Sequence, residues 1–341
     1  MSKRTPIQSQ HLFDYKLKGV PNEALKAELD ADYPVPQLSL EGDWNPAAYR
    51  QLCTDLMKTT YDSDPAYDES VELCDKQEVI VPPRDGNDAP VRIWIYRPHS
   101  LREDDSAPAI VYVHGGGSIG GSLEDTGPYY AKMAVDSQTV VCGVGYRMVP
   151  FVRYPYTMLD TYVGVKYVAE NAAAFGIDPE RIALSGDSAG GYQVLATVAK
   201  LAQNDETHLL KMARVGVSQI FDYFFTEPVE SMTPAESIAI QESKKVMEWM
   251  TGDDSERHLR EKNPHLFPGL ANDELLAKYP PFIIVEQEFD NFRTPSQRLA
   301  KRLDKSGRLL EFICYPGCGH GGGHENEQSD FQEMIDVYLK G

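Results

Sequence analysis

The chain has 341 residues, of which 42% are hydrophobic and 25% are charged, a composition typical of globular proteins. It carries 52 Asp and Glu residues against 33 Lys and Arg, which gives a formal net charge of −19. So acidic a surface repels phosphate backbones and anionic lipid headgroups, which argues against a nucleic-acid-binding or membrane-binding protein. A chain of this length forms either two average domains or one α/β core with an insertion.

The N-terminus and the cysteines bear on where the protein resides. The chain opens with polar residues and contains neither an apolar signal core nor an apolar run of membrane-spanning length. Its five cysteines follow no spacing typical of a disulfide framework; they are Cys53, Cys74, Cys142, Cys314 and Cys318. We therefore expect a cytoplasmic protein with reduced thiols.

Residues 1–75 form a charge-rich N-terminal segment that is interrupted by four prolines, Pro21, Pro34, Pro36 and Pro46. Short amphipathic stretches in this segment, such as residues 47–57, are predicted to be helices. Nothing in the segment carries chemistry by itself.

From residue 76 onward, apolar runs typical of strands alternate with stretches of helical periodicity. The predicted strands are 91–96, 109–113, 140–146, 182–185, 215–220, 282–285 and 309–315. The predicted helices are 160–173, 189–202, 295–305 and 330–339. This alternation predicts an α/β fold with a mostly parallel, doubly wound sheet covered by helices on both faces.

One long stretch, residues 223–280, breaks the alternation and is mostly helical in pattern. Its sequence 233–236 is a capping box with Pro at the first helical position, and Gly252 is placed to end that helix. A helical insertion between late strands is where a lid over an active site would lie. We therefore divide the chain into a core, formed by residues 76–222 and 281–341, and an inserted helical cap.

The sequence contains two G-x-S-x-G patterns, and such a pattern marks a nucleophile only where the serine stands on a strained turn between a strand and a helix. Ser188, in the pattern at 186–190, follows a predicted strand and precedes a predicted helix. Ser118, in the pattern at 116–120, precedes another glycine-rich stretch with no helix attached. Ser188 is therefore the predicted nucleophile.

The second pattern overlaps His114-Gly115-Gly116-Gly117, which directly follows a predicted buried strand. A flexible turn is the ordinary explanation of such a loop. Three consecutive glycines also let the backbone expose N–H groups at close range, as an oxyanion hole for a tetrahedral intermediate requires. The position of the loop ahead of the predicted nucleophile favours this second interpretation.

A serine nucleophile needs a base, and the base needs an acid that orients it. In α/β-hydrolases the acid and the histidine follow the serine in the chain, each after the end of a late strand. Asp290 follows the predicted strand 282–285 and is the favoured acid, although Glu286 or Glu288 could serve instead.

His320 follows the predicted strand 309–315 and is the favoured base, with His324 as its rival. The two histidines, together with Cys314 and Cys318, could also suggest a metal site. Such a site would need a helix to align the two imidazoles, and the glycines at 321–323 form a poor helix. We therefore expect neither a metal nor a cofactor.

Five motifs between about residues 91 and 320 resemble those of the hormone-sensitive-lipase-like family of α/β-hydrolases, which includes microbial and plant carboxylesterases. The motifs stand at 114–117, 146–150, 186–191, 289–293 and 317–321. The resemblance implies that the N–H groups of Gly116, Gly117 and Ala189 form the oxyanion hole and that Asp290 is the triad acid. It also implies that the N-terminal segment and the insertion pair as a cap.

The chain departs from this family's pattern in ways that concern the pocket. Ser118 stands where the family usually has an aromatic residue, Phe151 where it usually has an acidic one, and Tyr192 where it commonly has Asn. We expect Ser118 and Tyr192 to shape substrate preference. Thr294 replaces a second Asp and begins a capping box, so it is predicted to cap the following helix.

The predicted helix that begins near residue 233 has one apolar face, formed by Ala239, Val246, Trp249 and Met250. The ordinary role of such a face is to hold the insertion against the core. Met and Trp are also adaptable, large side chains, and the insertion leaves the strand edge that carries the predicted triad. Trp249 and Met250 are therefore candidate substrate-binding residues.

Together these features predict a serine hydrolase that cleaves carboxylic esters through an acyl-enzyme on Ser188. The expected partner is a small-molecule ester, with a homodimer as a further possibility and neither nucleic acid nor a membrane span. One alternative is acyl transfer, cyclisation or elimination by the same site. Another is a non-catalytic ligand receptor, which would be expected to lose a triad member, whereas Ser188, Asp290 and His320 are all present.

Overall fold

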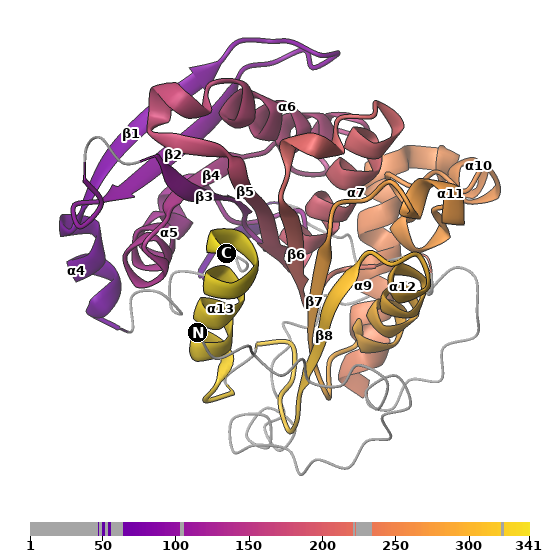
Figure 1. Ribbon diagram of the computed structural model, residues 1–341. Coiled ribbons are helices and arrows are strands. Elements are labelled where there is room, and N and C mark those ends of the chain that lie inside the picture. Colours follow the sequence, from indigo (N-terminus) through magenta and orange to yellow (C-terminus); the bar gives the residue numbers. More distant parts are fainter. Residues whose placement is uncertain are drawn as a thin grey trace.

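The computed structural model describes residues 64–102, 106–220, 234–321 and 324–341, together with residues 47, 50, 51, 54, 55 and 222 (Figure 1). For residues 234–242 it describes the backbone only. Of the predicted helix 47–57, five residues are described, and all five are helical. Thr233, the cap residue of the predicted capping box, lies outside the described residues.

The described part of the chain is built around one eight-stranded sheet in the order β1-β2-β4-β3-β5-β6-β7-β8. The strand β2 pairs with β1 and with β4 in antiparallel fashion, and all other neighbours are parallel. The predicted mostly parallel sheet is therefore confirmed. The strands are β1 (Cys74–Val81), β2 (Val91–Pro98), β3 (Ala107–Val113), β4 (Val140–Gly145), β5 (Ile177–Asp187), β6 (Met212–Gly216), β7 (Phe282–Gln287) and β8 (Leu309–Tyr315).

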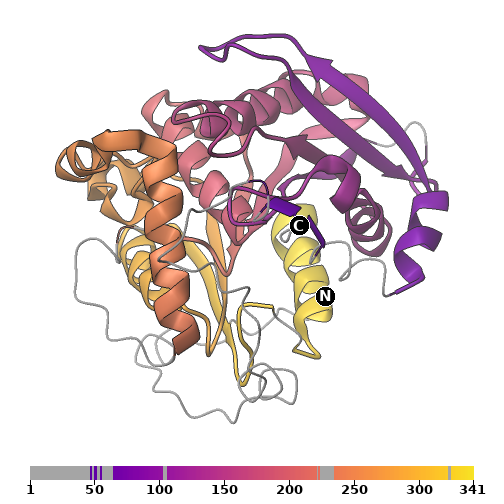
Figure 2. The same ribbon diagram turned by 180° about the vertical axis from the view of Figure 1, so that it is seen from behind.

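Helices cover both faces of this sheet, as Figures 1 and 2 show from opposite sides. A π-helical turn, Ile335–Lys340, continues the last of them. The α-helices are α4 (Ala66–Glu72), α5 (Leu123–Ser137), α6 (Tyr156–Glu170), α7 (Ala189–Gln203), α9 (Pro234–Thr251), α10 (Ser255–Arg260), α11 (Asp273–Leu276), α12 (Arg293–Lys305) and α13 (Glu327–Met334).

The hydrophobic core lies in two layers, one on each face of the sheet. Along β3, Val111 and Val113 pack into the layer formed with α6, α7 and α12, whereas Ile110 and Tyr112 pack into the layer formed with α5 and α13. This division follows from the strand geometry, because successive side chains point to opposite faces. It also explains why the central strands read as continuous apolar runs.

Three elements differ from the sequence-based prediction. The edge strand β1 was not predicted, because five of its six inner positions are exposed and most of them are polar. The helix α5 was also missed, since it contains Pro128, although Ser122 caps its start by accepting from the N–H of Asp125. The predicted strand 215–220 is wrong: β6 spans Met212–Gly216, and Val217 has a φ of +43° that ends the extended backbone.

Two predicted helix signals have opposite outcomes. Gly252 has a φ of +60° directly after the last residue of α9, so its predicted role in ending that helix is confirmed. The prediction that Thr294 caps α12 is wrong, because the cap position is Phe292 and no side chain caps the helix there. Arg293 N–H already donates to the carbonyl of Asp290, so the helical turn begins before Thr294.

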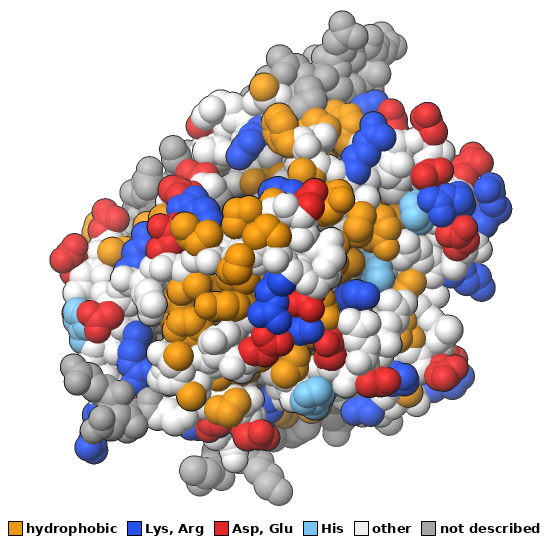
Figure 3. Space-filling model, turned by 90° about the horizontal axis from the view of Figure 1, so that it is seen from above, with side chains coloured by type: hydrophobic (Ala, Val, Ile, Leu, Met, Phe, Trp, Pro, Cys, Tyr) orange, Lys and Arg blue, Asp and Glu red, His pale blue; other side chains and the backbone are white. Residues whose placement is uncertain are grey.

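The surface matches the mixed charge of the sequence. On the face shown in Figure 3, acidic and basic side chains lie side by side around groups of hydrophobic ones. Within the described ranges, no helix combines the length and the apolar character that crossing a bilayer requires.

Candidate active site

Ser188 stands on the sharp turn between β5 and α7, as the sequence predicts. Its backbone has a φ of +57° and a ψ of −121°, a conformation that non-glycine residues rarely adopt. The turn is tight because Gly190 passes close to β3: a Cβ added to Gly190 would lie 2.0 Å from the carbonyl oxygen of Val113. The strained turn lifts the Ser188 hydroxyl out of the sheet edge, where a partner can reach it.

The structure brings His320 and Asp290 to this serine. Nε2 of His320 lies 2.9 Å from Oγ of Ser188, and Nδ1 of His320 lies 2.6 Å from Oδ2 of Asp290. The buried Asp290 carboxylate can only accept, so Nδ1 carries the proton and Nε2 is left to accept from the Ser188 hydroxyl. Asp290 is itself held by the N–H of Phe292, which donates to its Oδ1 over 2.6 Å.

The other carboxylates that could have served as the acid have different surroundings. Glu288 accepts from the N–H of Gly317 over 2.8 Å and so ties the loop after β7 to the loop after β8. Glu286 is fully buried, and burial followed by the charge of Asp290 raises its pKa well above the ordinary value. A carboxyl group with a raised pKa is poorly suited to stabilise an imidazolium cation.

The contacts of His324 do not involve Ser188, His320 or Asp290. Its ring stacks on Tyr315 at 4.9 Å between ring centroids, and its Nδ1 accepts from the N–H of Asn326. Among the described residues, no group of three or more His, Cys, Asp and Glu side chains is arranged to hold a metal ion.

The glycine-rich loop after β3 lies directly beside the serine turn. A Cβ added to Gly115 would lie 3.3 Å from Cβ of Ser188. Gly116 and Gly117 have φ values of +103° and +65°, and within the described residues neither they nor Ala189 donate a backbone hydrogen bond. Ala189 is the first residue of α7, where the N–H groups of a helix point outward. These three N–H groups are therefore free to donate hydrogen bonds to a negatively charged oxygen.

The loop is held in place by the segment after β4. The ring of Tyr146 stacks on His114 at 4.6 Å, and its hydroxyl donates to the carbonyl of His114 over 3.0 Å. The N–H of Val149 donates to the carbonyl of Ser118 over 3.0 Å. Ser118 itself is fully buried with a φ of +66°, so it supports the loop from within.

His114 makes the stability of the fold depend on pH. Burial lowers the pKa of His114 to about 4, although the Gly115 carbonyl acts in the opposite direction. The imidazole is protonated near pH 6.5 in the unfolded chain but only near pH 4 in the folded protein. The contribution of His114 to stability is therefore fully present above about pH 6.5 and is lost as the pH falls toward 4, because protonation then favours the unfolded chain. We expect His114→Gln to reduce the loss of unfolding free energy between pH 7.5 and pH 4.5 by about 3 kcal/mol.

Chemical denaturation of both proteins at these two pH values measures this difference. His265 has a pKa lowered to about 4 by burial and then by Lys200, so it contributes in the same window and remains unchanged in both proteins. Equal pH dependence in wild type and His114→Gln would show that His114 is not buried in its neutral form.

A partly buried ion pair next to Ser188 was not predicted from the sequence. Asp187, the residue before Ser188, forms an ion pair with Arg214 on β6 and accepts from the hydroxyl of Tyr112 on β3. A single Arg inside an otherwise apolar strand was the signal for this contact. The pair fixes the end of β5 against its neighbours and so positions the turn that carries Ser188.

The residues suggested for substrate binding in the helical insertion lie in one apolar cluster. Met250 is 1% exposed and packs there with Val246 and Met247, and Trp249 packs against the cluster from its edge. Tyr192 belongs to the same cluster, and its hydroxyl donates to the carbonyl of His265 over 3.1 Å. The cluster thus joins α7 to the insertion.

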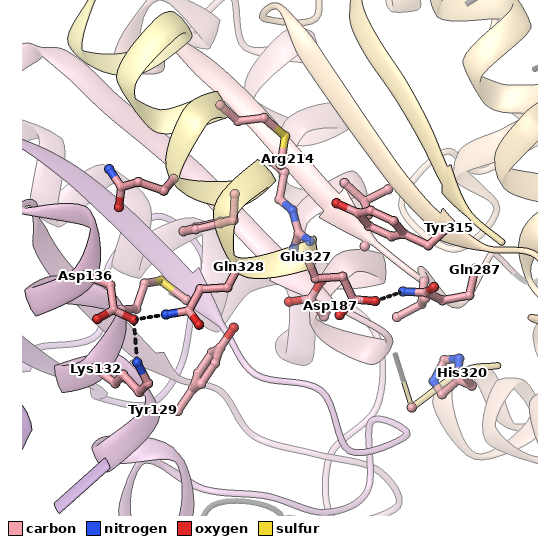
Figure 4. A pocket seen from close by; sticks show the side chains of 18 of the residues that line it. Tyr129, Lys132, Asp136, Asp187, Arg214, Gln287, Tyr315, His320, Glu327 and Gln328 are labelled. Atoms are coloured by element: carbon pink, nitrogen blue, oxygen red, sulfur yellow. Dashed lines mark hydrogen bonds and ion pairs between the residues drawn. The ribbon is translucent and has the colours of Figure 1, made fainter. Parts of the chain in front are cut away.

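A cavity of about 380 Å³ adjoins His320 on the face of the sheet that α5 and α13 cover. It lies between α5 and α13 and the ends of β5 to β8, and His320 and Asp187 form part of its wall (Figure 4). The cavity could not be predicted from the sequence, because its wall combines residues from seven separate elements.

The strained serine between β5 and α7, its hydrogen-bonded histidine and carboxylate, and the sheet order define an α/β-hydrolase. Comparison with known proteins agrees: residues 110–322 match the alpha/beta hydrolase fold family, and the chain belongs to this family. The resemblance to the hormone-sensitive-lipase-like carboxylesterases is likewise confirmed.

Two curated relatives and one solved structure illustrate this likeness. Carboxylesterase NlhH from Mycobacterium tuberculosis is 43% identical over 117 residues, which are 34% of this chain and only 35% of that protein. Ethyl acetate hydrolase from Pseudomonas putida is 28% identical over 240 residues, 70% of this chain and 72% of that protein. A thermostable esterase from Pseudomonas putida ECU1011 has the same fold, with a TM-score of 0.74 at 19% identity, covering 95% of this chain and 99% of that one.

Proposed function

We propose that the protein hydrolyses carboxylic esters through an acyl-enzyme on Ser188. The observation that carries this proposal is the hydrogen-bonded chain from Ser188 Oγ through the His320 ring to Asp290. The names of the relatives, a carboxylesterase and an ethyl acetate hydrolase among them, support the same reaction class.

Acylation follows from this geometry. His320 takes the proton of Ser188 as Oγ attacks the ester carbonyl carbon, and the buried Asp290 carboxylate stabilises the resulting imidazolium. The N–H groups of Gly116, Gly117 and Ala189 hold the oxyanion of the tetrahedral intermediate. His320 then gives its proton to the leaving alcohol oxygen as the ester C–O bond breaks.

Deacylation repeats these steps with water as the nucleophile. His320 takes a proton from the water as it attacks the acyl carbon, and the same N–H groups hold the second oxyanion. The proton returns to Ser188 Oγ when the carboxylic acid leaves. No step requires a metal ion or an organic cofactor.

Product analysis tests this proposal. With ethyl acetate as substrate, we expect acetate and ethanol, with the acetyl group passing to water in the presence of a competing alcohol. Transfer of most acetyl groups to the added alcohol would favour the alternative of acyl transfer. No turnover of any ester, with intact binding of the ester, would favour a receptor.

Met250 offers a test of how the insertion acts. We propose that Met250 mainly packs the insertion onto α7 and that Trp249 contributes to the substrate site from the edge of the same cluster. The buried Ser118 and Tyr192 are proposed to shape that site indirectly, through the glycine-rich loop and α7. Met250→Ala should lower the free energy of unfolding by 2–5 kcal/mol, about the usual cost of such a truncation in a core. Thermal unfolding measures the loss, and kcat/KM for acetyl, butyryl and octanoyl esters measures selectivity. A change in the chain-length profile by about 10-fold or more would instead place Met250 at the substrate.

We further infer the organisation and setting of the enzyme. The helices α9, α10 and α11 lie within the insertion, which we propose to act as a cap together with the N-terminal segment. Cys74, Cys142, Cys314 and Cys318 are free thiols, which supports a reducing, cytoplasmic setting. A homodimer is proposed from the sequence alone.

A further inference from the structure

We propose that the cavity beside His320 binds the alcohol part of the ester and selects an uncharged or cationic, hydroxyl-bearing group of about two fused rings. This inference rests on the proposed function and adds the class of substrate.

The position of the cavity assigns it to the alcohol rather than to the acyl group. In acylation, His320 donates its proton to the leaving oxygen, so the alcohol part must lie on the histidine side of Ser188. His320 and Gly321 line the cavity, and so does Asp187, the neighbour of the nucleophile. Gly116, Gly117 and Ala189, which face the carbonyl oxygen in our proposal, are not among the described residues that line it.

The size and the walls of the cavity fit a fused ring system. Its volume of about 380 Å³ is more than twice the roughly 150 Å³ that holds one benzene molecule in an engineered cavity. Aromatic rings and thioethers form much of the wall, namely Tyr129, Tyr315, Phe331, Met133 and Met334. Such side chains make favourable contacts with the faces and edges of aromatic rings.

An oriented amide in the wall calls for a hydroxyl group on the ligand. Gln287 is 3% exposed, and its Nε2 donates to Oε1 of Glu327 over 2.6 Å (Figure 4). A carboxylate accepts hydrogen bonds and does not donate them, so the amide atom of Gln287 that contacts Glu327 must be the nitrogen. The other amide atom, Oε1, is therefore the oxygen. Within the described part of the chain, Gln287 Oε1 has no hydrogen-bond partner, and protein atoms cover almost all of it. A buried acceptor of this kind is stabilised when the side chain yields enough for a ligand hydroxyl to reach it and donate to it.

The charges around the cavity disfavour an anionic group. Lys132 pairs with Asp136 over 2.6 Å, and Arg214 pairs with Asp187, so both cations of the wall are neutralised by neighbours. Glu327 has only neutral hydrogen-bond donors, the Gln287 amide and the N–H of His324. One unbalanced negative charge therefore faces the ligand, which repels a carboxylate and tolerates a cation.

A series of acetate esters that differ only in the alcohol tests this proposal, because all of them form the same acetyl-enzyme. The series contains ethyl acetate, naphthyl acetate, and naphthyl acetates that carry a hydroxyl or a carboxylate on the ring distant from the ester. Comparing each variant with wild type on the same ester cancels the intrinsic reactivity of the leaving group. Ethyl naphthoate carries the ring on the acyl side and serves as the reversed ester.

Two variants separate size from hydrogen bonding. Met133→Phe fills the cavity from α5 and should lower kcat/KM for the naphthyl acetates at least about 10-fold more than for ethyl acetate or for ethyl naphthoate. Gln287→Leu should lower kcat/KM about five-fold more for the hydroxynaphthyl ester than for naphthyl acetate, since only the former can donate to Oε1. Gln77→Leu, the same substitution at an exposed position on β1, should change nothing. Far-UV circular dichroism and the melting temperature of each variant show that it is folded.

If Met133→Phe lowers kcat/KM for ethyl naphthoate but not for naphthyl acetate, the cavity binds the acyl group and the proposal fails. The proposed chemical class of the alcohol would be overturned by either of two results. One is an equal effect of Gln287→Leu on kcat/KM for naphthyl acetate and for its hydroxyl derivative, and the other is efficient cleavage of the naphthyl acetate that carries a carboxylate.

Failure of the proposed function would look different, because wild type would then cleave none of these esters. In that case, fluorescence titration with dihydroxynaphthalene and hydroxynaphthoate still tests the cavity. Binding of dihydroxynaphthalene that is weakened by Met133→Phe and by Gln287→Leu would support the assignment of the cavity. Absence of dihydroxynaphthalene binding would overturn that assignment.

Discussion

Ser188→Ala is expected to lower the turnover of acetate esters by about a million-fold, the usual effect of removing the nucleophile of a catalytic triad. The substitution removes only Oγ, which lies 2.9 Å from the His320 ring. The strained turn itself is retained, since its φ of +57° is set by the surrounding glycines and by α7. The loss should therefore appear in kcat with little change in the melting temperature.

A serine-directed fluorophosphonate provides an independent readout of the same claim. We expect it to label Ser188 and to leave the buried Ser118 unmodified. Ser106→Ala, which truncates an exposed serine directly before β3, is the matched control and should retain full turnover and full labelling. Labelling that persists in Ser188→Ala would place the nucleophile elsewhere.

His320→Ala should be nearly as damaging as loss of the nucleophile, again by about a million-fold in kcat, because the members of a triad act as one unit. Without the imidazole, no group accepts the Ser188 proton or returns it to the leaving alcohol. Asp290→Asn keeps the shape of the site but favours the wrong tautomer of His320, so we expect a smaller loss of about ten-thousand-fold.

His324→Ala is the matched control for His320→Ala, because it removes an imidazole from the same loop. His324 stacks on Tyr315 and contacts Asn326, and neither of these residues belongs to the triad. We expect most of the activity to remain, with a modest loss of thermal stability from the lost ring contact. Steady-state kinetics on one acetate ester compares the three variants. Loss of activity in His324→Ala with retention in His320→Ala would reverse the assignment.

The fold class and the arrangement of Ser188, Asp290 and His320 could be predicted because each signal is local in the sequence. Small residues around Ser188 permit a tight turn, and this requirement is visible as a short pattern between a strand and a helix. Asp290 and His320 each follow a buried strand, and the ends of parallel strands meet at one edge of the sheet. Local sequence therefore implied contacts between residues that are far apart in the chain.

Features that depend on tertiary contacts could not be predicted in this way. The paired strand β1 exposes most of its side chains, so no apolar alternation marks it. Thr294 has the sequence of a helix cap, but contacts of Asp290 start the helix two residues earlier. The pairing of Arg214 with Asp187, and the cavity that both line, depend on how β5 and β6 align. Spacing along the chain does not encode that alignment.

The proposed reaction requires that Ser188 carries an acyl group during turnover. Rapid acid quenching of the protein with an acetate ester, followed by mass spectrometry of its peptides, measures this directly. We predict that the peptide containing Ser188 gains the mass of one acetyl group, and that this species forms and decays at rates consistent with kcat. Turnover of the ester without any acetylated Ser188, or with the acetyl group on another residue, would contradict the account.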